Sequence, residues 1–205
     1  MLFGKKVTIK FLEYGITPYS LALIDMDIAL EAVQDGANEC VFIMEHNALY
    51  SAGRSFVHSD FTGCINIPIY YPKRGGRVTV HSLGQLIIYP IINLKHRNIN
   101  ISEYIHMLEM WIIRVLKNFQ IDAFCSDKGR GIWTSFGKIG FIGIGISKGV
   151  SYHGVCLNIS NDLSLFNSII PCGINNIQIT SIKEIFSNKI NMQIVIQNLV
   201  KSSPF

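Results

Sequence analysis

The chain has 205 residues, of which 49% are hydrophobic and 16% charged, and this composition excludes a disordered protein. Its longest apolar stretch, residues 83–94, contains Pro90 and is shorter than the roughly 20 residues that span a bilayer, so no membrane association is expected. The net charge of +4 is mild, and the sequence lacks the Lys/Arg stripe interleaved with aromatic residues that indicates nucleic acid binding.

The first half of the chain predicts one helix between short strands. Residues 5–13 read as a strand, and residues 17–36 as a helix with Thr17 as N-cap, Pro18 at the first helical position and Gly36 as its stop. A strand follows over residues 39–46. Residues 64–71 and 84–91 are β-branched or aromatic runs that predict two more strands on either side of a glycine-rich turn.

The second half predicts a helix, a run of strands and a final helical segment. Residues 100–119 have apolar positions at helical spacing, and Asn100 with Glu103 fits a capping box. Residues 122–160 alternate like three consecutive strands, and residues 181–200 are helical in pattern. Because the last strands follow one another without helices, we expect an α/β (α+β) fold with one mixed sheet flanked by helices.

The organisation of the chain is simple. No linker or repeat divides it, which predicts a single domain over residues 1–205. The N-terminus lacks an apolar segment with a cleavage site, so a cytoplasmic protein is expected. The five cysteines include no C-x-x-C pair, which indicates reduced thiols rather than disulfides or a cysteine-based zinc site.

The stretch "RGGRVTVH", from Arg74 to His81, is the first candidate site. Consecutive glycines allow close approach of a ligand, Arg74 can engage an anionic group, and His81 can exchange protons near neutral pH. A hairpin turn with exposed charges would give the same pattern. The stretch fits neither the phosphate-loop nor the dinucleotide fingerprint.

The stretch "GKIGFIGIGIS", residues 137–147, is the second. Alternation along a strand places Phe141, Gly143, Gly145 and Ser147 on one face. Repeated glycines on one face predict that a ligand chain or another backbone lies close against it. The same alternation places Lys138 on the isoleucine face, so a role for Lys138 in the site requires a bulge or bend near Gly140.

Two further positions are open between a functional and a structural role. Cys172 lies between Pro171 and Gly173, where controlled geometry suits a nucleophile; taken alone, the stretch favours an inert turn cysteine. His153 is either a site residue or a hydrogen-bonded structural histidine. Residues 161–162 are expected to form a turn or cap before a short amphipathic segment.

Taken in order, the motifs "LEYGITPYSLAL", "EHNALYSAGRS", "RGGRVTVHSLGQL", "GKIGFIGIGIS", "SYHGVCLNIS" and "IIPCGI" resemble those of the lipoyl(octanoyl) transferases, the octanoyl-[acyl-carrier-protein]:protein N-octanoyltransferase family. The resemblance covers nearly the whole chain. It implies the fold of biotin/lipoate protein ligase catalytic domains and the first step of endogenous protein lipoylation.

The resemblance also implies a mechanism in which Cys172 takes the octanoyl group from a carrier-protein thioester and Lys138 pairs with it. A nearby ammonium enlarges the thiolate fraction of a thiol, and a neutral lysine can act as general base in the second half-reaction. Backbone amides near Cys172 are the expected oxyanion donors. The implied acyl and thioester site is lined by Arg74, Gly75, Gly76, Arg77, Val78, Thr79, Val80, His81, Phe141, Ile142, Gly143, Gly154, Val155 and Cys156.

The resemblance implies no cofactor and no metal, since the thioester arrives already activated. Its implied partners are octanoyl acyl carrier protein and the apo lipoyl domains of 2-oxoacid dehydrogenase complexes and glycine cleavage H protein, and we expect a monomer. The chain departs from the family at Val80, Ser82, Leu83 and Gly145. The alternatives are an ATP-dependent lipoate or octanoate ligase of the same fold, a thioesterase using Cys172, and a decayed, non-catalytic acyl-carrier-protein binder.

Overall fold

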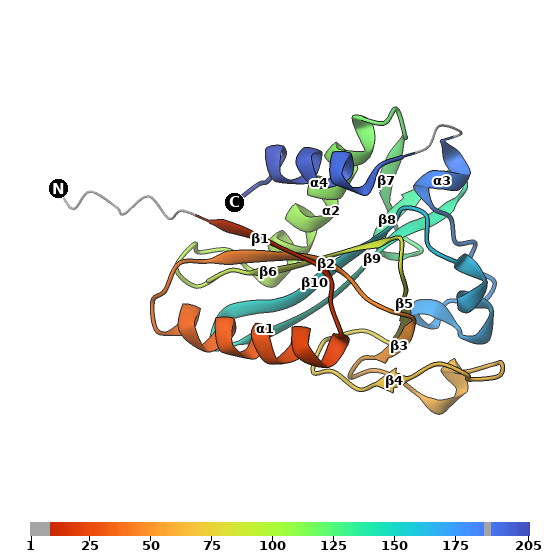
Figure 1. Cartoon of the computed structure of the whole chain (residues 1–205), viewed down its shortest axis with the longest axis horizontal. Coiled ribbons are helices and arrows are strands. Elements are labelled where there is room, and N and C mark those ends of the chain that lie inside the picture. Colours follow the sequence, from red (N-terminus) through yellow and green to blue (C-terminus); the bar gives the residue numbers. More distant parts are fainter. Residues whose placement is uncertain (1–8, 187–189) are drawn as a thin grey trace.

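The computed structural model describes residues 9–186 and 190–205 and contains two sheets (Figure 1). In the larger sheet only the first pair of strands is parallel, so the sheet is mixed. Its strand order is β1 (Lys10–Ile16), β2 (Cys40–Glu45), β6 (Gln85–Ile91), β10 (Val150–Asn158), β9 (Gly137–Ser147), β8 (Gly129–Thr134) and β7 (Ala123–Ser126). The smaller sheet has the order β4 (Ile69–Tyr70), β3 (Leu49–Ala52) and β5 (Val78–His81).

Helices cover both faces of the larger sheet (Figure 1). One face packs on α1 (Tyr19–Gln34) and on the smaller sheet, and the other on α2 (Ile101–Lys117) and α4 (Met192–Lys201). The shorter helices are η1 (His58–Asp60), η2 (Leu163–Ser168), η3 (Pro171–Gly173) and α3 (Ile182–Ile185). The expectation of a mixed sheet flanked by helices is therefore confirmed.

Local signals in the sequence place the starts of α2 and η2. The capping box of α2 is present, since Asn100 accepts from the amide of Glu103 and the Glu103 carboxylate accepts from the amide of Asn100. Asp162 caps η2 in the same way, by accepting from the Ser164 amide. The N-terminus of α1 was expected one residue too early: Pro18 has ψ 133° and is the N-cap, so the helix begins at Tyr19.

Several elements differ from the expectation. Only Ile69–Tyr70 of residues 64–71 is a strand, while β3 and β5 were not expected as strands. Residues 122–160 form four strands rather than three, because β7 and β8 are separated by a tight turn. In the described part of residues 181–200 there are two helices, α3 and α4. Residues 187–189 of this expected helix and residues 5–8 of the first expected strand lie outside the described residues.

A helix that crosses a bilayer must be both long and apolar. In the described ranges no helix meets both requirements.

Candidate active site

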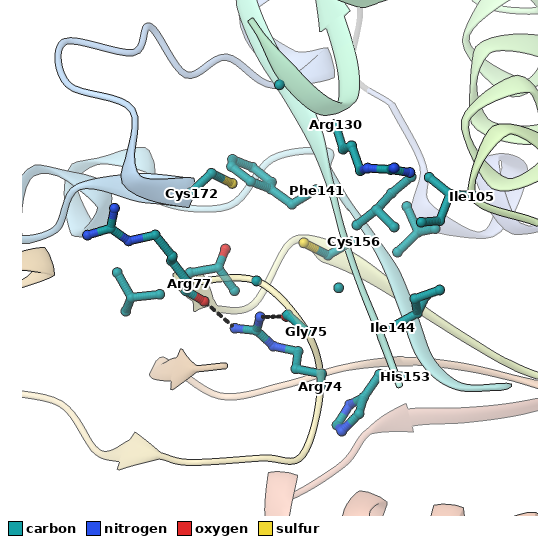
Figure 2. Close-up of a pocket in the computed structure, with 18 of the residues that line it drawn as sticks. Arg74, Gly75, Arg77, Ile105, Arg130, Phe141, Ile144, His153, Cys156 and Cys172 are labelled. Carbon is teal, nitrogen blue, oxygen red and sulfur yellow. Dashed lines mark hydrogen bonds between the residues drawn. The ribbon is translucent and has the colours of Figure 1, made fainter. Parts of the chain in front are cut away.

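A cavity of about 380 Å³ lies between the loop before β5, the centres of β9 and β10, and the turn that contains Cys172 (Figure 2). Every lining residue expected from the sequence borders it except Val80, which is fully buried in the core on the α1 side of the sheet. The cavity is also lined by His153, whose role was open from the sequence, and by residues that were not expected there, which are Tyr89, Ile105, Lys128, Gly129, Arg130, Ile144 and Ile174.

Lys138 and Cys172 meet beside this cavity although they are far apart in the sequence. The Lys138 amine donates to the Cys172 sulfur over 3.4 Å and to the Arg130 carbonyl oxygen over 2.6 Å. Lys138 is fully buried, and its nitrogen lies 5.1 Å from the ring centroids of both Trp133 and Phe141. A buried amine with these partners can exchange a proton with the thiol.

A β-bulge directs Lys138 toward the site. Between β8 and β9 the register shifts by one residue, since Ile132 pairs with Gly140 whereas Trp133 pairs with Lys138. The extra residue on β9 is Ile139, which is fully buried. A bulge re-aims the side chains that precede it. The bend near Gly140 that a site role for Lys138 requires is therefore present.

The turn around Cys172 has a restricted backbone. Cys172 adopts φ 58° and ψ 11°, a left-handed conformation that is uncommon for a residue other than glycine. Gly173 follows with φ 72°, and a Cβ there would lie 2.2 Å from Nη1 of Arg77. The side chain of Arg77 is in turn held by an ion pair with buried Asp60. Only glycine at 173 allows this packing.

The amides after Cys172 are already engaged. Gly173 donates to the Ile170 carbonyl over 3.1 Å, and Ile174 donates to the Pro171 carbonyl over 3.2 Å. These two amides are therefore engaged within the turn in this conformation, and the expectation that backbone amides near Cys172 act as oxyanion donors stays a prediction.

The hydrogen bonds of Arg74 bear on the role that its position suggested. Its guanidinium donates to the carbonyls of Gly75 and Arg77 (Figure 2). It also donates to the hydroxyl and the carbonyl of Ser51. Arg74 is buried, and these bonds fix the loop before β5. Its guanidinium is thus hydrogen-bonded to the protein itself, and these bonds favour a role in fixing the loop over the engagement of an anionic group.

The glycines of β9 and β10 accommodate the protein's own groups. A Cβ on Gly143 would lie 3.0 Å from Cδ of Arg74, and one on Gly145 would lie 2.2 Å from the ring of Tyr152. A Cβ on Gly154 would lie 2.3 Å from the backbone oxygen of Ile88. Gly143 and Gly154 still border the cavity, but the Tyr152 ring rather than a ligand chain or a backbone covers Gly145.

The histidines at the cavity are neutral. Burial, with a smaller contribution from His46, holds the pKa of His81 well below its usual value, and Nδ1 of His81 bonds to Oε1 of Gln85 over 2.7 Å. Burial also lowers the pKa of His153 to about 3, with smaller effects from Arg74 and His46. The expectation that His81 exchanges protons near neutral pH is therefore wrong.

His153 makes folding sensitive to acid. Between about pH 6.5, the ordinary pKa of histidine, and about pH 3, the unfolded chain binds a proton at this residue that the folded chain does not. The free energy of unfolding therefore falls with decreasing pH, by up to about 1.4 kcal/mol per pH unit for one group.

The variant His153→Asn should lose less stability between pH 7 and pH 5 than the wild type, as measured by urea unfolding. Asparagine does not titrate in this range and tolerates the left-handed φ of 55° at this position. An equal loss in both proteins would contradict the prediction.

The second cysteine at the cavity is a poor nucleophile. Burial raises the pKa of the Cys156 thiol to about 12, so this thiol stays protonated at neutral pH. Cys172 is half-buried and contacts the Lys138 amine, so of these two cysteines it is the one suited to nucleophilic attack.

One group of side chains outside the cavity has the composition of a metal site. The ligand atoms of His106, Glu109 and Cys125 lie within 4.8 Å of one another, at the contact of α2 with β7. Burial and Glu109 raise the pKa of the Cys125 thiol to about 11, so this cysteine is protonated at neutral pH. This group was not expected from the sequence.

Comparisons with known proteins find relatives that match most of the chain. Residues 18–203 match the family model of the lipoyl protein ligase A/B catalytic domain. The chain is 40% identical over 182 residues to a protein named octanoyltransferase from Rickettsia massiliae, covering 85% of this chain and 84% of that protein.

Solved structures show the same fold at low sequence identity. Lipoate-protein ligase A bound with ATP superposes with a TM-score of 0.72 at 15% identity, covering 94% of this chain and 83% of that one. Biotin protein ligase from Aquifex aeolicus superposes with a TM-score of 0.53 at 12% identity, covering 95% of this chain and 66% of that one. From the family match and the octanoyltransferase relatives, we conclude that this chain belongs to the lipoyl protein ligase A/B catalytic domain family.

Proposed function

We propose that this chain is an octanoyltransferase, which transfers an octanoyl group from octanoyl acyl carrier protein to a lysine of a lipoyl domain. The observation that carries the proposal is the 3.4 Å contact between the Lys138 amine and the Cys172 sulfur beside a largely apolar cavity. The 40% identity to a protein named octanoyltransferase supports it. In this proposal residues 1–205 act as a single catalytic domain, as a monomer in the cytoplasm.

The first half-reaction forms an acyl-enzyme. Lys138 takes the proton of the Cys172 thiol, and the thiolate attacks the carbonyl carbon of the octanoyl thioester. A C–S bond forms to Cys172 while the C–S bond to the carrier breaks. Lys138 returns its proton to the departing carrier thiolate, which leaves the lysine neutral.

The second half-reaction uses the neutral lysine. An amine on the lipoyl domain attacks the thioester carbon, and Lys138 accepts the proton that this nitrogen must lose. The C–N bond forms, the bond to Cys172 breaks, and the thiolate and ammonium are regenerated. The acceptors in this proposal are lipoyl domains of 2-oxoacid dehydrogenase complexes and the glycine cleavage H protein.

The cavity suits a small acyl chain delivered by a carrier. Its volume of about 380 Å³ is within the range of small-molecule sites, which is about 300–1,000 Å³. Phe141, Ile142, Ile144 and Val155 provide apolar lining. Lys128 and Arg130 are exposed residues at the same cavity and give it positive charge, which would attract an acidic carrier protein.

An assay without ATP distinguishes this proposal from a ligase of the same fold. The purified protein and an apo lipoyl domain receive either octanoyl acyl carrier protein alone, or free octanoate with ATP and Mg²⁺. Because the thioester is already activated, we expect octanoyl-lysine on the domain only in the first mixture. Octanoyl-lysine formed only in the mixture with free octanoate and ATP would instead establish the ligase. The absence of octanoyl-lysine in both mixtures would favour a non-catalytic binder.

A further inference from the structure

The carbonyl that accepts from Lys138 belongs to a peptide group that is held from its other side by α2. The Arg130 oxygen lies 2.6 Å from the Lys138 amine, and the next amide in the chain, that of Gly131, donates to Oε1 of Glu109 over 3.0 Å. These two atoms belong to one planar trans peptide unit, in which C=O and N–H point in opposite directions. The orientation of the carbonyl is therefore set wherever the N–H is held.

Gly131 gives this peptide little rigidity of its own. It adopts φ 118°, a backbone conformation that glycine tolerates and other residues avoid. A Cβ at Gly131 would lie 2.6 Å from the Gly140 oxygen and 2.8 Å from Cε of Lys138, so close packing of the lysine also requires glycine here. The chain thus has a flexible residue next to the Arg130 carbonyl, whose direction determines whether it can accept from the Lys138 amine.

Glu109 is an unusual residue for the buried face of α2. It is 8% exposed, and the other buried residues of that helix are Tyr104, Ile105, Leu108, Trp111, Ile112, Val115 and Leu116. Burial of a carboxylate is unfavourable unless it is hydrogen-bonded. In the described ranges no lysine or arginine forms an ion pair with Glu109, and its other oxygen faces the Cys125 thiol at 3.5 Å and Nδ1 of His106 at 3.9 Å.

We propose that Glu109 is a positioning residue, which holds the Arg130–Gly131 peptide so that its carbonyl accepts a hydrogen bond from the Lys138 ammonium. The negative charge strengthens the bond to the Gly131 amide and polarises the peptide, which makes the Arg130 oxygen a better acceptor. The amine is thereby kept beside the Cys172 sulfur. The inference rests on the proposed role of Lys138 in the transfer reaction.

The test compares Glu109→Gln and Glu109→Leu with the wild type and with Cys125→Ser. The serine variant changes the group that faces the second oxygen of Glu109 and leaves the bond to Gly131 in place. The first readout is the rate at which iodoacetamide alkylates Cys172, followed by peptide mass spectrometry, because this small reagent reports on the thiol without needing the acyl site. The second readout is kcat and KM for octanoyl transfer.

Glu109→Leu should slow Cys172 alkylation and lower kcat by roughly tenfold or more, with KM within about twofold of the wild type, since a charge-assisted hydrogen bond is lost. Glutamine keeps an acceptor but not the charge, so Glu109→Gln should recover part of the rate and remain about fivefold slow. Cys125→Ser should react at the wild-type rate.

Thermal unfolding of each variant separates positioning from a purely structural role. Wild-type alkylation rates in both Glu109 variants, with or without a lowered Tm, would overturn the inference. If Glu109→Leu does not fold, the isosteric Glu109→Gln carries the test alone, and an unchanged rate in that variant would overturn the inference. If the wild type transfers no octanoyl group but Glu109→Gln still slows alkylation, the proposed function fails and the positioning role stands.

Discussion

Cys172→Ala should abolish octanoyl transfer, with a reduction of at least about 10⁴-fold, because removal of a covalent nucleophile leaves only binding and positioning. The variant should still fold, since Cys172 lies in a half-buried turn and its side chain is only partly packed. The measurement is the initial rate of octanoyl-lysine formation on an apo lipoyl domain, supplied with octanoyl acyl carrier protein.

The control for this variant is Cys64→Ser, since Cys64 is exposed and does not border the cavity. It should retain the wild-type rate. Substantial transfer by a folded Cys172→Ala protein would mean that the acyl group passes directly from carrier to acceptor without a covalent intermediate.

Lys138→Met should lower the transfer rate by roughly 10²- to 10⁴-fold, the usual contribution of general acid–base catalysis. Methionine approximates the length of the buried lysine stem but cannot exchange a proton with Cys172 or donate to the Arg130 carbonyl. The lost hydrogen bond costs about 1–3 kcal/mol of stability, which is partly offset because a buried charge is also removed. Stopped-flow or quench measurement of acyl-enzyme formation tests this prediction.

Lys138→Arg is the matched comparison, since it retains a positive charge. A guanidinium is larger and planar and does not act as a base at neutral pH. The lysine site is fully buried against Trp133 and Phe141, so the arginine variant should not recover the rate. A near wild-type rate in either variant would show that Lys138 is not the base.

The fold was predictable from the sequence where local signals are strong. The apolar spacing of residues 100–119 and the capping pair Asn100 and Glu103 predicted α2 closely, and the absence of helices between the last strands predicted the mixed sheet. The predicted boundaries of strands were wrong where tertiary contacts, rather than local sequence, determine which residues form a strand. The strands β3 and β5 have four residues each and pair only with each other and β4, so their short segments carry little periodicity of their own.

Only part of the candidate site was predictable from the sequence. The resemblance to the family predicted that Lys138 pairs with Cys172, and the structure has this contact. Strict alternation along the strand showed that Lys138 reaches the site only if the strand contains a bulge or bend, and the bulge at Ile139 provides it. Side-chain partners were not predictable. Sequence alone did not show that the Arg74 guanidinium bonds to its own loop, or that burial holds His81 neutral.

The role proposed for Glu109 could not be predicted from the sequence. In the sequence it is one carboxylate on an amphipathic helix, where acidic residues are usually solvated. Its contact with the Gly131 amide joins residues 22 positions apart and depends on how α2 packs on β8. No local pattern encodes such a contact, so the structure was needed to connect it to Lys138.

The central claim is that Cys172 carries the octanoyl group during transfer. The most direct test is peptide mass spectrometry of the protein after mixing with octanoyl acyl carrier protein, followed by addition of an apo lipoyl domain. We expect an octanoyl adduct on the peptide that contains Cys172, which disappears as octanoyl-lysine appears on the domain. Octanoyl-lysine formed without any adduct on Cys172 at early times, or an adduct that only hydrolyses, would contradict the account.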